Sequence, residues 1–188
     1  MSYMNGSVKN YLKDLAARLP APGGGSVAAL AGSMAASLVA MAAAFTIGKK
    51  KYQKVSGRMK KIESRARQLQ RRLASLCDQD IRAYRSKNLK AAIMVPAEIA
   101  RLSREVAILA QEVLYEGNAS LATDTVLAVM LAEASFTACL FYIQVNLRHA
   151  VASTARHQKI LHDLKKCLPD FKKMRKNAED YVGTSFGW

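Results

Sequence analysis

The sequence contains few of the residues that break or cross-link a chain. Its 188 residues include four prolines, ten glycines and three cysteines, and aromatic side chains make up only 7%. Few prolines and glycines leave few ends for short strands, while Ala, Leu, Lys and Arg dominate the long segments between them. With 51% hydrophobic residues, the chain is long enough for one well-buried core. We therefore predict a single all-α domain over residues 1–188.

Patterns typical of cross-links and metal sites are also missing. The three cysteines form no CxxC pair and the three histidines form no HExxH motif, so neither a disulfide framework nor a metal site is predicted. No segment at the start of the sequence has the charged, apolar and small-residue order of a signal peptide. We therefore expect a cytoplasmic protein.

Acidic residues are scarce. There are 14 Asp and Glu against 29 Lys and Arg, which gives a net charge of +15. Eleven of the basic residues, with Glu63 as the one acid, lie between Lys49 and Arg72. This density is typical of a solvated helix face or of a surface that binds an anion. The charge predicts attraction to nucleic acid, anionic lipid or a small substrate with carboxylates or phosphates, and does not choose among them.

Charge is absent from Ser26 to Ile47, a stretch of 22 residues. This length meets the roughly 20 residues of a transmembrane helix. However, nine of the residues are alanine and several others are Ser or Thr, which gives little drive into lipid. A buried central helix is therefore favoured over a membrane span. The segment 120–153, in which only Asp124 and Glu133 are charged before Arg148, predicts a second central helix.

Helical spacing of apolar residues predicts further helices around these two. We expect them over residues 5–18, about 55–87, and from Pro96 to Gly117. A basic tail over 155–188 predicts one or two short helices with a break at Pro169. Ser26 is expected to cap the first central helix.

Three consecutive glycines, Gly23, Gly24 and Gly25, stand just before that helix. Glycines let a ligand approach the backbone closely, and amides at a helix N-terminus favour an anion or a carbonyl oxygen. The block is neither GxxxxGK[ST] nor GxGxxG, and no strand precedes it, so a standard nucleotide loop is not indicated. From these residues alone it is either a tight turn between helices or a ligand-binding loop.

Two carboxylates, Asp78 and Asp80, interrupt the basic helix in the segment DQDIRAY. Residues two apart on a helix point about 200° apart, so both cannot face one pocket in the same way. Asp80 falls near the stripe that contains Cys77 and Tyr84, whereas Asp78 points elsewhere. Both could equally be surface counter-ions to nearby arginines. For Asp124 too, two interpretations are open: it caps a helix or it faces a polar cavity.

The segments LPAPGGGSVAALAG, TIGKKKY, DQDIRAY, VPAEIA, GNASLATD and VNL follow one another in an order that resembles a known family. It is the cyclodeaminase domain of formiminotransferase-cyclodeaminase, together with stand-alone methenyltetrahydrofolate cyclohydrolases, and the match covers about residues 8–150. The resemblance implies an all-helical, dimer-forming, folate-binding bundle built on the two central apolar helices. In one departure from the family pattern, the segment between Tyr84 and Pro96 is shorter than usual. In another, Tyr142 stands where an asparagine is common.

The resemblance also implies site residues. It places a folate pocket near Gly23, Gly24, Gly25 and Ser26, with Asp80, and less plausibly Asp78, for acid–base work. Asn118, Asp124 and Asn146 match further positions of the family motifs. Lys49, Lys50 and Lys51 could meet the glutamate carboxylates of a folate, including a polyglutamylated one.

The implied activity is hydrolysis of 5,10-methenyltetrahydrofolate to 10-formyltetrahydrofolate, with no cofactor beyond the folate substrate and no metal. Cyclodeamination of 5-formiminotetrahydrofolate is the alternative, and the hydrolase is preferred because no formiminotransferase domain is fused. A third hypothesis is a non-catalytic member that binds an anionic partner, such as nucleic acid, through its basic surface. A homodimer is expected, and a membrane is not.

Overall fold

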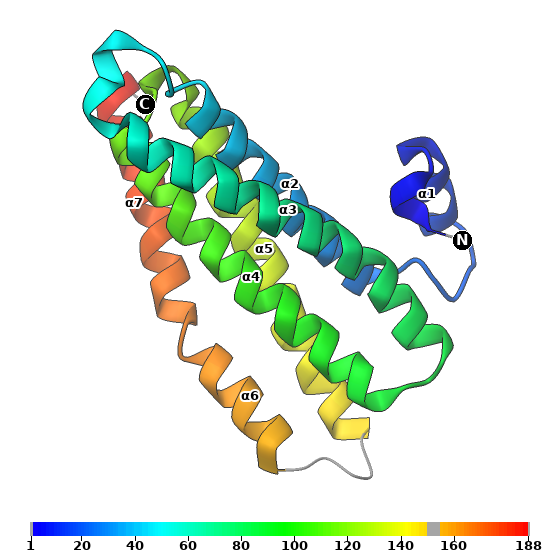
Figure 1. The fold of residues 1–188 in the computed structure, drawn as a ribbon. Helices are drawn as coiled ribbons and strands as arrows, with labels where there is room; N and C mark the ends of the chain where they lie inside the picture. Colours follow the sequence, from blue (N-terminus) through cyan, green and yellow to red (C-terminus); the bar gives the residue numbers. More distant parts are fainter. Residues whose placement is uncertain (1, 150–154, 188) are drawn as a thin grey trace.

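The computed structural model describes residues 2–149 and 155–187, and all regular structure within them is helical (Figure 1). The predicted all-α class is confirmed. The long helices are α1 (Val8–Leu15), α2 (Gly24–Ala44), α3 (Ser56–Arg85), α4 (Leu89–Glu116), α5 (Ala122–His149), α6 (Ala155–Lys165) and α7 (Leu168–Phe186). Three short 3₁₀ helices are η1 (Tyr3–Asn5), η2 (Lys50–Val55) and η3 (Ala119–Leu121).

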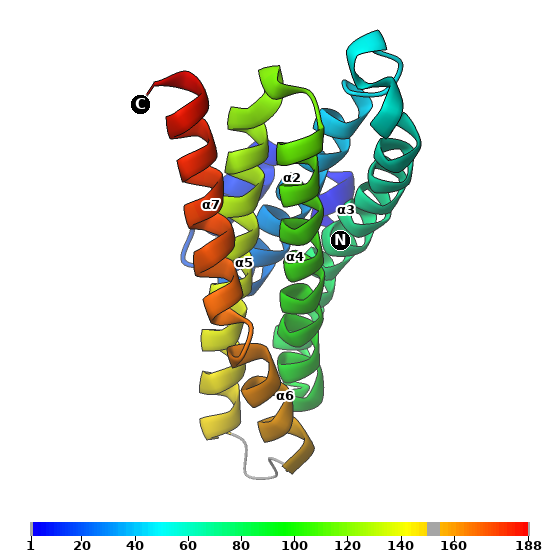
Figure 2. The ribbon, with the colours of Figure 1, turned by 90° about the vertical axis from the view of Figure 1, so that its left-hand side faces the viewer.

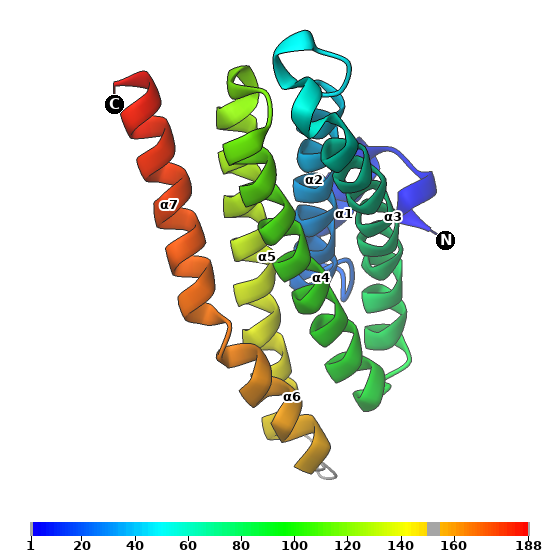
Figure 3. The same cartoon turned by 60° about the vertical axis from the view of Figure 1, so that its left-hand side comes forward.

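Helices α2 to α5 form an up-and-down bundle (Figure 2). Each helix packs against the next in the chain, and α5 closes the bundle against α2. The connections are short, which favours antiparallel neighbours. Helices α6 and α7 lie on the outer side of α5 and α4, while α1 stands outside the bundle on the side of α2 (Figures 1 and 3). The connecting loops and the helix termini therefore lie at the two ends of the bundle.

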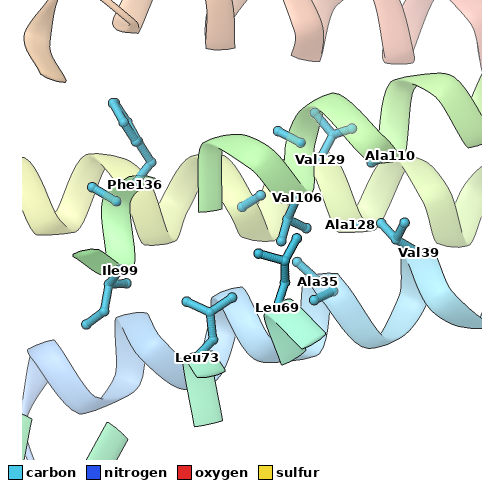
Figure 4. Packing of buried hydrophobic residues seen from close by; sticks show 14 of the residues in the cluster. Ala35, Val39, Leu69, Leu73, Ile99, Val106, Ala110, Ala128, Val129 and Phe136 are labelled. Carbon is cyan, nitrogen blue, oxygen red and sulfur yellow. The ribbon is translucent and has the colours of Figure 1, made fainter. Parts of the chain in front are cut away.

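Apolar side chains from all four helices meet in the core, with Leu69, Leu73, Ile99 and Phe136 among the largest of them (Figure 4). Helix α2 contributes mainly alanines and Gly32. A Cβ at Gly32 would lie 2.9 Å from the Ser103 hydroxyl and 3.1 Å from the Ser135 hydroxyl. These small residues let α2 approach α4 and α5 closely.

The two central apolar helices of the prediction are present as α2 and α5. Each is long and apolar enough to cross a membrane by length and composition, as judged over Gly24–Ala44 and Ala119–Arg148. About half of the most apolar window in each is buried inside the bundle, 56% and 50% respectively. The end of the second predicted helix, residues 150–153, lies outside the described residues.

The basic face of α3 is partly neutralised by α4. Arg58, Arg65 and Arg72, spaced by seven residues, form ion pairs with Glu112, Glu105 and Glu98, which are spaced by seven in the opposite direction. Seven residues are two helical turns, so the pairs form a ladder between antiparallel helices. Exposed pairs contribute little stability each, about 0–1 kcal/mol. This ladder supports the interpretation of α3 as a solvated face.

Two boundary predictions were wrong. Pro96 does not open a helix, since it lies inside α4, which begins at Leu89 and is capped by the side chain of Asn88 accepting from the Ala91 N–H. Ser26 does not cap α2, because Gly23 is the capping residue. The Ser26 hydroxyl instead donates to the Gly23 carbonyl at 2.7 Å.

Other boundaries agree more closely. Helix α1 is shorter than predicted, and α3 matches its predicted range within about two residues. The tail forms two helices, α6 and α7, with Pro169 in the first turn of α7.

Candidate active site

A pocket of about 370 Å³ lies at the end of the bundle where α2 begins. Its walls come from the loop before α2 and from all four bundle helices. The lining residues are Pro20, Ala21, Gly23, Gly24, Gly25, Asp80, Ala83, Tyr84, Ala92, Pro96, Phe141, Tyr142, Val145 and Asn146. The glycine block, Asp80 and Asn146, which lie far apart in the sequence, thus share one site.

Asp80 is the charged residue among those that line this pocket. Burial raises the pKa of its carboxyl to about 6, and a hydrogen bond from the backbone N–H of Ser26 acts in the opposite direction. This N–H belongs to the first turn of α2, where unpaired amides and the helix dipole favour a negative charge. The carboxylate is therefore held at a helix N-terminus with a pKa close to neutral pH, which suits a general base.

Pocket residues approach the start of α2 so closely that side chains larger than glycine do not fit there. A Cβ at Gly25 would overlap the Asp80 carboxylate, and one at Gly24 would overlap the Tyr142 hydroxyl. At Gly23 a Cβ would meet nothing within 4 Å. Two of the three glycines are thus required by close packing, and the block is part of the pocket wall.

Aromatic side chains form much of the remaining wall. Phe141 and Tyr84 are 63% and 62% exposed and stand at the rim, where a planar ligand could stack on them. Burial, with smaller effects from Cys139 and Asp80, raises the pKa of the Tyr142 hydroxyl. Tyr142 is therefore protonated at neutral pH and can donate a hydrogen bond into the pocket.

Asn146 is held by a hydrogen bond to a carbonyl of α4 that Pro96 leaves without its helical donor. A proline has no N–H, so Pro96 cannot donate to the carbonyl of Ala92 four residues earlier. The Asn146 amide nitrogen donates to that carbonyl at 2.7 Å. The proline and the asparagine thus fix the wall between α4 and α5.

Behind the glycine block lies a buried hydroxyl pair. The Tyr11 and Ser26 hydroxyls are 3.0 Å apart, which ties α1 to the start of α2. Next to them, burial raises the pKa of the Cys77 thiol to about 12. This thiol is protonated and is not a nucleophile at neutral pH.

Asp78 does not reach the pocket. It accepts hydrogen bonds from the Ser2 hydroxyl and from the backbone N–H of Tyr3, so it fastens the N-terminal segment to α3. The structure separates the two aspartates as their helical positions predict, and it brings Asp80 alone to the site.

Five other predicted site residues lie at the opposite end of the bundle. Lys49, Lys50 and Lys51 follow α2, whose 21 residues span about 30 Å. Asn118 is buried beside them, with its N–H donating to the Thr46 hydroxyl at 2.9 Å. Asp124 lies in the first turn of α5. Within one chain the structure does not bring these residues to the pocket.

Sequence reasoning did not single out Phe141, Tyr142 or Pro96 as pocket residues. The signal for Tyr142 was its departure from the asparagine of the family pattern, and the signal for Pro96 was a proline within a continuous helical pattern. Among the described residues, no group of three or more His, Cys, Asp or Glu side chains could hold a metal ion.

The fold and the pocket define a helical-bundle protein with a small-molecule site built around one carboxylate at a helix N-terminus. The sequence profile of the formiminotransferase-cyclodeaminase family matches residues 7–87 and 85–166. The chain therefore belongs to the formiminotransferase-cyclodeaminase family.

Individual relatives agree with this assignment. The chain is 32% identical over 167 residues to a methenyltetrahydrofolate cyclohydrolase of Methylorubrum extorquens, covering 77% of this chain and 80% of the relative. It is 24% identical over 170 residues to the formimidoyltransferase-cyclodeaminase of Mus musculus, covering 78% of this chain and 31% of that longer protein. The crystal structure of a formiminotetrahydrofolate cyclodeaminase from Thermotoga maritima superposes with a TM-score of 0.82, at 26% identity and 98% coverage of both chains.

Proposed function

We propose that this protein is a methenyltetrahydrofolate cyclohydrolase, which adds water to 5,10-methenyltetrahydrofolate and opens it to 10-formyltetrahydrofolate. The observation that carries the proposal is the Asp80 carboxylate, half-buried at the N-terminus of α2 in a pocket with aromatic walls. The similarity to the cyclohydrolase of Methylorubrum extorquens supports the same reaction.

The chemistry of the substrate matches that of the pocket. The bridging carbon of methenyltetrahydrofolate is part of an amidinium cation, which a carboxylate attracts. Asp80 would accept a proton from the attacking water as the new carbon–oxygen bond forms. The protonated carboxyl would return this proton to the ring nitrogen as the carbon–nitrogen bond breaks, and the hydroxyl proton of the intermediate would pass to solvent as the formyl carbonyl forms. A pKa near 6 suits both steps, because the group changes protonation state with little cost near neutral pH.

The other pocket residues would hold the ring system. Tyr84 and Phe141 offer aromatic faces for a pterin, and Tyr142 offers a hydroxyl donor. Asn146 adds a polar contact from a position fixed by the Ala92 carbonyl. We propose that the protein works in the cytoplasm and needs no cofactor beyond its substrate.

Cyclodeamination is the alternative for the same pocket, and the structural match to the Thermotoga maritima cyclodeaminase favours it. In that reaction 5-formiminotetrahydrofolate closes to the methenyl compound and releases ammonia. Incubation of the purified chain with each substrate separates the two. A cyclohydrolase converts the methenyl compound to 10-formyltetrahydrofolate without releasing ammonia, whereas release of ammonia from the formimino compound would assign the deaminase.

Nucleic-acid binding through the basic surface receives less support. Three arginines of α3 are already paired with glutamates of α4. Salt-dependent binding to arbitrary RNA or DNA, without folate binding, would favour this hypothesis instead.

A further inference from the structure

The hydroxyl of Tyr142 and the carboxylate of Asp80 lie against consecutive residues at the start of α2. A Cβ at Gly24 would overlap the Tyr142 hydroxyl and would lie 2.9 Å from the ring carbon that carries it. A Cβ at Gly25 would overlap the Asp80 carboxylate. Consecutive Cα atoms are about 3.8 Å apart. The two polar groups, one from α5 and one from α3, are therefore neighbours in the pocket wall.

The Tyr142 hydroxyl stays protonated beside this carboxylate. Burial is the main cause of the raised pKa of the hydroxyl, and Cys139 and Asp80 contribute smaller increases. The influence of Asp80 agrees with the short separation of the two groups. The site thus holds a neutral donor next to the carboxylate that we propose as the base.

Other donors in the pocket are less well placed. Among the described residues that line it, three side chains donate hydrogen bonds at neutral pH, namely Tyr84, Tyr142 and Asn146. Tyr84 is 62% exposed and stands at the rim. The Asn146 amide already donates to the Ala92 carbonyl. Tyr142 is half-buried, and it is the donor that lies beside Asp80.

The attacking water of the proposed hydrolysis needs a donor at this place. Asp80 accepts one proton of the water while one lone pair of the water oxygen forms the bond to the bridging carbon. The second lone pair remains free. The water must lie within hydrogen-bond distance of Asp80, at about 2.6–3.2 Å, which brings it next to the Tyr142 hydroxyl. The phenol can then donate to the free lone pair and fix the orientation of the water.

The same oxygen needs a donor again when the ring opens. It is a hydroxyl in the tetrahedral intermediate, and it becomes the formyl carbonyl when the carbon–nitrogen bond breaks and its proton passes to solvent. The oxygen gains negative charge as this proton leaves, and a fixed donor stabilises such charge. Tyr142 keeps its own proton throughout, so the proton balance of the reaction is unchanged.

We propose that the Tyr142 hydroxyl donates a hydrogen bond to the oxygen that water brings to the bridging carbon, first in the attacking water and then in the formyl product. This role rests on the proposed function. It makes Tyr142 a residue that distinguishes folates with an oxygen at this position from folates without one.

The first test is binding at equilibrium, which requires no turnover. We expect Tyr142→Phe to bind 10-formylfolate about tenfold more weakly than the wild type, because the formyl oxygen loses its donor. Folate, which lacks the formyl group, should bind equally well to both proteins. The matched control is Tyr115→Phe, at an exposed tyrosine in the last turn of α4, and it should bind both ligands as the wild type does. Calorimetric titration measures these affinities.

The outcomes separate the role of Tyr142 from the proposed function. An equal loss of affinity for both ligands in Tyr142→Phe, or no loss for either, would overturn this role and leave folate binding intact. A wild type that binds neither ligand would refute a folate as the substrate, and the role of Tyr142 with it.

The second test is the rate of hydrolysis of 5,10-methenyltetrahydrofolate. Tyr142→Phe should lower kcat about a hundredfold, the lower end of the effect of one such donor. KM should stay within about twofold, because the substrate has no oxygen on the bridging carbon before water attacks. The acid limb that Asp80 sets should not move. A raised KM with unchanged kcat would assign Tyr142 to substrate binding, and a shifted limb would show that it acts through Asp80; either result would contradict the proposal.

Gly24→Ala displaces the Tyr142 hydroxyl without removing it. The new Cβ would overlap the hydroxyl, so kcat should fall at least about tenfold, as expected for a misplaced catalytic group. In a Tyr142→Phe background the hydroxyl is already absent, and the same replacement should lower kcat less than about threefold. Equal losses in the two backgrounds would show that Gly24→Ala acts independently of the hydroxyl and would overturn the proposal.

Discussion

The side-chain amide of Asn146 on α5 occupies the place of the N–H that Pro96 on α4 lacks. It donates to the Ala92 carbonyl at 2.7 Å, so two residues that line the pocket share one hydrogen-bonding arrangement. An unpaired carbonyl in a half-buried position is costly, and this explains why a proline is tolerated within α4.

Replacement of Asn146 should therefore be costly only while Pro96 is present. We expect Asn146→Ala to lower the free energy of unfolding by about 1–2 kcal/mol. In a Pro96→Ala background the helix regains its own N–H donor, and the same replacement should cost less than about 0.5 kcal/mol. Urea unfolding of the four proteins measures both values. Equal costs in the two backgrounds would disprove the coupling.

Gly25→Ala should disable the site and destabilise the fold. The new Cβ would overlap the Asp80 carboxylate, which must move, and overpacking of this kind costs about 1–3 kcal/mol. We expect folate affinity to fall at least about tenfold, which corresponds to about 1.4 kcal/mol. Gly57→Ala is the control, because a Cβ there meets nothing within 4 Å. It should bind folate as the wild type does, and similar behaviour of the two variants would contradict the close-packing explanation.

The pH dependence of activity should follow Asp80. Because burial raises the pKa of its carboxyl to about 6, the base form is lost as the pH falls through 6. We expect kcat/KM to drop about tenfold per pH unit below this value. Asp78→Asn should keep the same acid limb, since Asp78 lies against Ser2 and Tyr3. A shift of the limb in that variant would assign the base to Asp78.

The free energy of unfolding should depend on pH in the opposite direction from activity, again because of Asp80. The pKa of the Asp80 carboxyl is higher in the folded chain than the value of about 3.9 in an unfolded one. The folded state thus holds more protons between pH 4 and 6, and the free energy of unfolding decreases as the pH rises through this window. We expect Asp80→Asn to be more stable than the wild type at pH 7 by about 1–2 kcal/mol, after allowance for solvent at the pocket mouth. Thermal unfolding at pH 4 and pH 7 measures this, and an equal difference at both pH values would refute it.

The sequence carried most of the fold because its signals were periodic. The uncharged run predicted α2 as a buried central helix, and the helical spacing of apolar residues predicted α3, whose buried face those residues form. The choice of Asp80 over Asp78 came from the angle between neighbouring helical positions, and the structure brings Asp80 alone to the pocket.

What the sequence could not provide were effects that depend on distant contacts. The sequence predicts a helix start at Pro96 because a proline cannot donate the hydrogen bond that a helix interior requires. In the structure Asn146, fifty residues away, donates to the Ala92 carbonyl instead. Ser26 was predicted to cap α2 because the sequence does not show that its hydroxyl contacts the Tyr11 hydroxyl of another helix. The sequence predicts that Lys49–Lys51 and the glycines Gly23–Gly25 bind the same ligand, although the straight helix α2 holds them about 30 Å apart.

The most direct measurement follows the absorbance of the methenyl chromophore when purified protein is added to 5,10-methenyltetrahydrofolate at pH 7, beside a protein-free blank. The wild type should remove the chromophore with saturable kinetics, and Asp80→Asn should reduce the rate by at least about a hundredfold, the usual scale of a general base. Equal rates for the wild type and Asp80→Asn, or a wild-type rate no faster than the blank, would contradict the assignment of this pocket as a cyclohydrolase active site.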